Sequence, residues 1–177
     1  MKPSPLSDIS GPHPLPGLPV ALADISMLSR YGEDNAMGVI AIVVHPDTAF
    51  YRLSPESVQR LRQEITRRLN GKLRDGDRLY SLSSWEWLVV LPELRSSAIL
   101  TLAMLKFRQL FVEHSLSIDG ITLHLPVYCG AAIHPDDGED ALHLVQSARI
   151  AGLHAQRDGL GGALYTVEME ELDDRLK

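Results

Sequence analysis

The stretch RDGDRLYSLSSWEWLVVLP, residues 74–92, decides the fold. Two short apolar runs, 79–82 and 87–91, flank the polar residues Ser83–Glu86, and a proline follows the second run. Short apolar runs separated by a polar tip are typical of a β-hairpin. The Asp- and Gly-rich segment Arg74–Asp77 before them is typical of a turn. The sequence therefore predicts a turn that leads into a hairpin.

Outward from this hairpin, helical and extended patterns alternate. The β-branched run Val39–Val44 is typical of a strand covered on both faces. Apolar residues at helical spacing surround it, and Asp119-Gly120 marks a second hairpin turn. The predicted elements are helix 19–30, strand 39–44, helix 55–69, strands 79–82 and 87–91, a helix from Ser96 or Ser97 to about 114, strands 116–118 and 121–133, helix 141–159 and strand 163–167.

This element order predicts an α/β fold. Strands that alternate with helices and also form two hairpins indicate a mixed sheet with helices packed over it.

Composition excludes several classes of protein. The chain has 177 residues, of which 45% are hydrophobic and 23% charged, as in soluble globular proteins. A net charge of −6 argues against nucleic-acid binding by bulk electrostatics. The apolar runs are far shorter than the roughly 20 residues of a membrane-spanning helix, and the first twenty residues hold no signal-like apolar run. We therefore expect a cytoplasmic protein with no membrane insertion and no nucleic-acid partner.

Four segments, in order and at regular spacing, resemble motifs of one family. They are His13–Pro19, the R-x-x-D segment Arg74–Asp77, the segment Ser83–Trp87 followed by an apolar strand, and Gly130–Gly138. The chain resembles a GGDEF domain, the catalytic module of diguanylate cyclases, which join two GTP molecules into cyclic di-GMP. The resemblance predicts a five-stranded mixed sheet with surrounding helices and a ferredoxin-like β-α-β-β-α-β core. It also predicts a domain over residues 13–168, a proline-rich tail over 1–12 and an acidic tail over 169–177.

The signature positions depart from the family pattern. The resemblance places Ser83 and Ser84 where the family has two glycines, and Trp85 where it has a magnesium-binding carboxylate. It aligns His45 with the other metal-binding aspartate and Gln156 with a phosphate-binding lysine. Magnesium prefers hard oxygen ligands in an octahedron. The resemblance thus predicts a degenerate domain that has lost magnesium binding and is not an enzyme.

One carboxylate and two tryptophans occupy the rest of the signature. Glu86 is retained between Trp85 and Trp87, whose side chains alternate to the same face of the hairpin. We expect Trp87 to lie in the core. Trp85 has two readings: it covers the vacated nucleotide pocket, or it forms a docking surface for a partner.

Arg74 and Asp77 match the family's inhibitory site, which binds cyclic di-GMP. An arginine fork can donate to guanine O6 and N7 together, and a carboxylate can accept from the other guanine edge. The alternative is a plain turn with charged flanks. Lys106 and Arg108 either add basic contacts or belong to a solvated helix face.

The remaining reactive residues predict no further chemistry. The seven histidines are too scattered in sequence for a zinc site, and Cys129 lies in an apolar run typical of a buried thiol. The main hypothesis is an inactive signalling domain that binds cyclic di-GMP through Arg74 and Asp77. A module that binds a protein partner without nucleotide is the alternative, and residual GTP binding or cyclase activity is a third.

Overall fold

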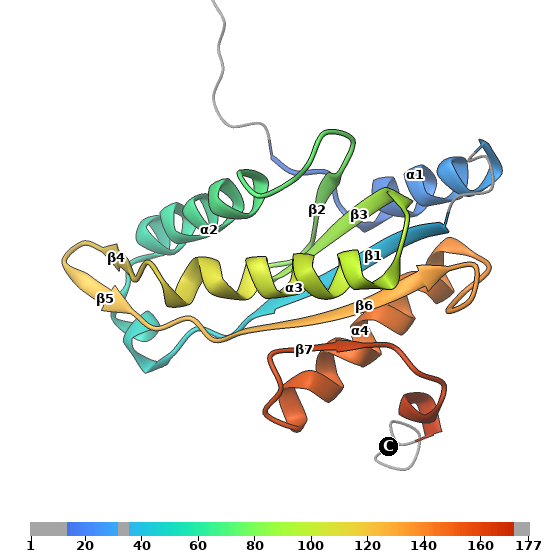
Figure 1. The fold of residues 1–177 in the computed structure, drawn as a ribbon. Coiled ribbons are helices and arrows are strands. Elements are labelled where there is room, and N and C mark those ends of the chain that lie inside the picture. Colours follow the sequence, from blue (N-terminus) through green and yellow to red (C-terminus); the bar gives the residue numbers. More distant parts are fainter. Residues whose placement is uncertain (1–13, 32–35, 172–177) are drawn as a thin grey trace, which may run out of the picture.

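The computed structural model describes residues 14–31 and 36–171 (Figure 1). Four α-helices and seven strands alternate along this part of the chain, together with one short 3₁₀ helix. In chain order they are α1 (Leu18–Tyr31), β1 (Ala36–Val44), η1 (Thr48–Arg52), α2 (Pro55–Asn70), β2 (Arg78–Ser83), β3 (Glu86–Leu94), α3 (Ser97–Val112), β4 (Leu116–Ile118), β5 (Ile121–Leu123), β6 (Val127–His134), α4 (Ala141–Arg157) and β7 (Gly162–Leu164).

Five of the strands form one mixed sheet in the order β2-β3-β1-β6-β7. Strand β1 lies at its centre and pairs antiparallel with β3 and with β6, whereas β7 pairs parallel with β6. The order β2-β3-β1-β6, with α2 and α3 as the connections, is the predicted β-α-β-β-α-β core. The predicted fold class is therefore confirmed.

The two faces of the sheet are covered by different helices, α2 and α3 on one face and α1 and α4 on the other (Figure 1). Side chains of β1 alternate between these layers: Ile40 and Ile42 join the core under α2 and α3, while Val39 and Ala41 join the core under α1 and α4. Because both faces are buried, an unbroken β-branched run suits this strand.

Local sequence signals fix the beginnings of the helices. Ser54 caps α2 by accepting a hydrogen bond from the Ser57 backbone N–H, with a proline at the first helical position, as predicted. Of the two candidate caps for α3, the structure selects Ser96. Asp140 caps α4 in the same way.

Two predicted strands differ in extent from the observed ones. The predicted strand 121–133 is broken at 124–126, and β5 pairs with β4 in a separate two-stranded sheet. The break has two causes: the His124 backbone N–H donates to the Asp47 carboxylate, and Pro126 has no N–H to donate. The last strand, predicted over 163–167, ends at Leu164, after which one helical turn covers 168–171.

The sequence did not predict η1, which begins where the Asp47 side chain accepts from the Ala49 N–H at 2.8 Å. The predicted tail 1–12 and residues 172–177 of the acidic tail lie outside the described residues. None of the described helices combines the length and the apolar character needed to cross a bilayer.

Candidate functional site

The hairpin between β2 and β3 places the signature residues at the end of the central strand. Ser83 pairs with Glu86 as the last register pair, and Ser84 and Trp85 form the turn. The Val44 N–H donates to the Trp85 carbonyl at 3.0 Å, and Arg62 Nε donates to the Ser84 carbonyl at 2.8 Å. These bonds fix the tip against β1 and α2.

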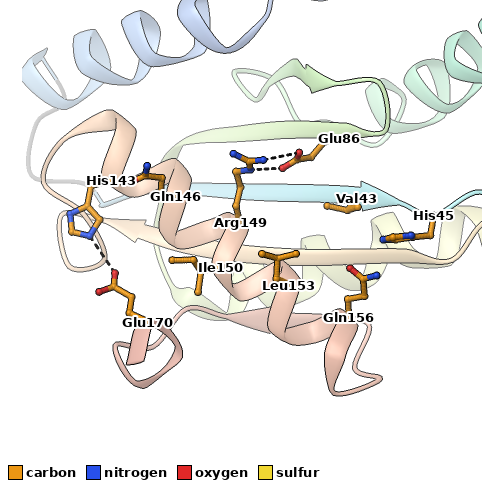
Figure 2. A pocket seen from close by; sticks show the side chains of 10 residues that line it. All are labelled: Val43, His45, Glu86, His143, Gln146, Arg149, Ile150, Leu153, Gln156 and Glu170. Atoms are coloured by element: carbon orange, nitrogen blue, oxygen red, sulfur yellow. Dashed lines mark hydrogen bonds and ion pairs between the residues drawn. The ribbon is translucent and has the colours of Figure 1, made fainter. Parts of the chain in front are cut away.

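A groove of about 630 Å³ lies beside this tip, along one side of α4 (Figure 2). His45 from the end of β1 and Gln156 from α4 both line it, so the fold brings together two positions that the resemblance aligns with a metal-binding aspartate and a phosphate-binding lysine. The ten lining residues, drawn in Figure 2, are Val43, His45, Glu86, His143, Gln146, Arg149, Ile150, Leu153, Gln156 and Glu170.

Both carboxylates that line the groove already have partners. Glu86 accepts two hydrogen bonds from Arg149, from Nε at 2.6 Å and from Nη2 at 3.2 Å. Glu170 accepts from the Tyr165 hydroxyl at 2.5 Å and lies 3.6 Å from His143 Nε2. Burial, followed by this hydrogen bond, raises the pKa of Tyr165 to about 12.

These donors do not fit magnesium. The ion requires several free oxygen ligands in an octahedron, whereas Glu86 is neutralised by Arg149 and His45 offers a ring nitrogen. Among the described residues, no three His, Cys, Asp or Glu side chains are grouped so that they could hold a metal ion.

The two tryptophans of the hairpin point towards the α2 and α3 layer. Trp87 is 1% exposed, and its indole N–H donates to the Thr66 hydroxyl at 3.2 Å, which is the predicted core position. Trp85 packs edge to face on Phe50 of η1, with ring centroids 5.0 Å apart. Trp85 does not line the groove beside His45 and Glu86.

The R-x-x-D segment forms a closed turn between α2 and β2. The Asp77 carboxylate accepts from the Arg74 backbone N–H at 2.9 Å and from Arg74 Nε at 3.3 Å, and Gly76 supplies a positive φ of 90°. The Asp77 side chain is 7% exposed and that of Arg74 is 48% exposed. Asp77 therefore orients Arg74, whose guanidinium faces solvent.

Three basic side chains meet around this turn. Lys72, Arg74 and Lys106 line a pocket of about 120 Å³ together with Asp77. Of the two basic residues considered on α3, Lys106 thus lines the same pocket as Arg74 and Asp77, whereas Arg108 lies against Gly161. The other lining residues are apolar: Val89, Leu91, Ile99, Leu102, Ala103 and Phe107.

Cys129 lies in β6 and is fully buried, as the sequence predicts. Burial raises the pKa of its thiol to about 12. A thiol that stays protonated near neutral pH is a poor nucleophile.

Comparison with solved structures identifies the fold. The GGDEF domain of TpbB (YfiN) from Pseudomonas aeruginosa superposes with a TM-score of 0.81 and 21% identity, over 90% of this chain and 95% of that chain. This chain has the GGDEF-domain fold. The active GGEEF domain of a Vibrio cholerae diguanylate cyclase has a TM-score of 0.68 and 16% identity, over 86% and 98% of the two chains.

A third solved relative with the GGDEF fold was determined with a protein partner. It is the P. aeruginosa diguanylate cyclase SiaD in complex with its activator SiaC, with a TM-score of 0.71 and 20% identity, over 85% of this chain and 58% of that one. No protein-family model and no curated protein sequence matches the chain. The likeness therefore concerns the fold, and the chemistry of this chain has to be argued from its own residues.

Proposed function

We propose that this chain is a regulatory domain that binds cyclic di-GMP and does not synthesise it. The observation that carries the proposal is the pocket that Lys72, Arg74 and Lys106 line together with Asp77. Cyclic di-GMP presents two guanine edges and two phosphodiester anions. An arginine fork suits guanine O6 and N7, and lysines suit phosphate as point charges.

The turn supports this assignment through preorganisation. Asp77 holds the Arg74 backbone and Nε, so the arginine loses less conformational freedom when a ligand binds. Ile99 and the 58% exposed Leu102, which also line the pocket, offer an apolar surface for a base. In this proposal Arg74 reads guanine, Lys72 and Lys106 neutralise phosphate, and Asp77 positions Arg74.

The groove beside the hairpin tip lacks the groups that the synthesis of cyclic di-GMP requires. Phosphoryl transfer depends on positioning and on metal charge. Trp85 offers no metal ligand, and Glu86 is paired with Arg149. The resemblance aligns His45, which has no carboxylate, with the other metal-binding aspartate. Ser83 and Ser84 add side chains at a tip where glycines would let a phosphate approach the backbone.

Calorimetric titration with cyclic di-GMP tests the binding half of the proposal. We expect saturable binding by the unmodified chain and a loss of at least about tenfold in Arg74→Ala, the value of one bidentate guanine contact. Lys106→Ala should weaken binding less and reduce its salt dependence. Arg78→Ala is the matched control, because Arg78 is close in sequence, exposed and outside the pocket.

Two results would contradict the proposal. Absence of binding by the unmodified chain, or equal binding by Arg74→Ala, would remove the receptor role. Incubation with GTP and magnesium should yield no cyclic di-GMP above a blank without protein, and clear turnover would overturn the inactive assignment.

A second candidate function is a module that binds a protein partner without nucleotide. Exposed apolar side chains on α3 favour it, since Leu102 is 58% exposed, Leu105 45% and Val112 80%. The diguanylate cyclase SiaD, which has the same fold, was solved with a protein activator. The titration discriminates the two candidates: this one requires that cyclic di-GMP produces no saturable heat.

A further inference from the structure

The ion pair between Glu86 and Arg149 spans two elements of the groove. Glu86 begins β3 and lies opposite Val43 of β1 in the register, whereas Arg149 comes from the middle of α4. Figure 2 shows the Arg149 side chain crossing from α4 to Glu86, with both hydrogen bonds directed at the carboxylate. The helix therefore supplies a cation to the hairpin.

The surroundings hold this cation in one place. The Glu86 side chain is only 13% exposed, so its charge is largely removed from solvent and needs a counter-charge. The planar guanidinium of Arg149 donates to both carboxylate oxygens of Glu86 in a bidentate pair. A divalent ion would have to compete with Arg149 for these two oxygens. Close packing of α4 on β6 at Gly130 fixes the helix backbone that carries Arg149.

We infer that Arg149 is the resident cation of this groove and that it excludes divalent metal ions from Glu86. The inference goes beyond the proposed function, because the Arg74 pocket and the groove share no residue. A divalent ion at Glu86 would lie against a positive guanidinium that already uses the available oxygens. Exclusion thus depends on Arg149 itself, in addition to the replacement of carboxylates by His45 and Trp85.

The inference predicts that a reversal of charge at position 149 creates a cation site. Arg149→Asp places a second carboxylate on α4 towards Glu86, in a groove that His45 also lines. Carboxylate oxygens and an imidazole suit Mn²⁺, a paramagnetic substitute for magnesium. The two carboxylates, now facing each other without a counter-ion, would be relieved of their repulsion by the metal.

The test is a titration of the full chain with Mn²⁺, with free ion measured by electron paramagnetic resonance. We expect Arg149→Asp to bind one equivalent at least about tenfold more tightly than the unmodified chain, as expected when charged oxygen ligands are added. Combining it with Glu86→Gln should return affinity to the unmodified level. Arg95→Asp, an equal charge change at an exposed position outside the groove, should bind no more tightly than the unmodified chain.

Arg149→Gln provides a second variant that adds no new charge. It removes the partner of Glu86 but adds no second carboxylate. We therefore expect a smaller gain in Mn²⁺ affinity than in Arg149→Asp, and this gain should also disappear when Glu86→Gln is added. Circular dichroism melting shows whether each variant folds. If one of Arg149→Asp and Arg149→Gln does not fold, the Mn²⁺ affinity of the other one tests the inference.

Two outcomes would overturn the inference. One is Mn²⁺ binding by the unmodified chain that depends on Glu86, because the pair would then not exclude the ion. The other is a folded Arg149→Asp or Arg149→Gln chain with no Glu86-dependent gain. Neither outcome alters the cyclic di-GMP titration, which concerns a different pocket.

Discussion

Replacing Gly130 by alanine should be the most damaging small substitution in the sheet. Gly130 lies in β6 directly beneath α4, and a Cβ there would stand 2.1 Å from the Ala148 carbonyl oxygen and 2.1 Å from the Gly152 nitrogen. Ordinary contacts of a Cβ begin at about 3.4 Å. The helix would have to withdraw by about 1.3 Å, because the atoms it meets are backbone and cannot rotate away.

The cost follows from what that withdrawal opens. α4 packs on the sheet through Ala148, Ala151 and Ala155, each 0% exposed. A radial gap of about 1 Å forfeits up to half of the dispersion energy of each contact. Overpacking of this kind costs about 3 kcal/mol, which for a chain of this size lowers the melting temperature by about 6–12 °C.

Gly152→Ala is the matched control. Gly152 faces Gly130 from the helix, but a Cβ at this position would lie 3.4 Å from the Gly130 nitrogen and further from other atoms. Alanine also favours a helix over glycine by about 0.5–1 kcal/mol. We therefore expect Gly152→Ala to melt within a few degrees of the unmodified chain, although the two glycines are in contact.

Thermal and urea unfolding followed by circular dichroism measure both variants. Withdrawal of α4 also carries Arg149 away from Glu86, so the ion pair at the groove should loosen in Gly130→Ala alone. Melting of Gly130→Ala within about 2 °C of the unmodified chain would refute the reasoning, as would an equal loss in both variants.

Three further predictions concern single titratable groups. Burial and a hydrogen bond to Asp24 raise the pKa of Tyr80 to about 12. The stability that Tyr80 contributes is therefore present below pH 10 and is lost as the pH rises towards 12. Tyr80→Phe should lower the free energy of unfolding by about 1 kcal/mol at neutral pH, and its stability in urea unfolding should decline less between pH 10 and pH 12. Hydrogen bonds from two arginines of α2 lower the pKa of Glu64 to about 2. Its stabilisation is present above about pH 4.5 and is lost on acidification towards pH 2, so Glu64→Gln should unfold with a shallower acid dependence, and an unchanged slope would count against the pairing. Cys129 should react with a thiol reagent only at the rate of unfolding, and rapid labelling of the native chain would contradict its burial.

Local sequence patterns predicted most of the helices and strands, and the resemblance predicted their arrangement in a five-stranded sheet. The alternation of apolar residues in 79–82 and 87–91 predicted the hairpin, and the β-branched run predicted the central strand. The break at 124–126 was missed because a side chain 77 residues away, Asp47, takes the His124 N–H out of the strand ladder. A strand pattern contains no sign of such a distant acceptor.

The candidate site could be predicted only in part. Arg74 and Asp77 are three residues apart, and a short motif was enough to pair them. Arg149 gave no signal, since it pairs with a residue 63 positions earlier and looks like any charged residue on an exposed helix face. The contact of Trp85 with Phe50 was also missed, because Phe50 lies in a 3₁₀ helix that the sequence did not predict.

The position of the tryptophans makes the hairpin optically distinct from the rest of the molecule. The chain contains two tryptophans, and both lie in this hairpin. Trp87 is enclosed in the core, whereas Trp85 is half-buried at the tip and contacts Phe50. Intrinsic fluorescence excited at the red edge therefore reports on this one segment without a label. A ligand that binds at the Arg74 turn and changes only the turn should leave the emission unchanged. A ligand that also changes the conformation of β2 and the hairpin tip should shift the emission.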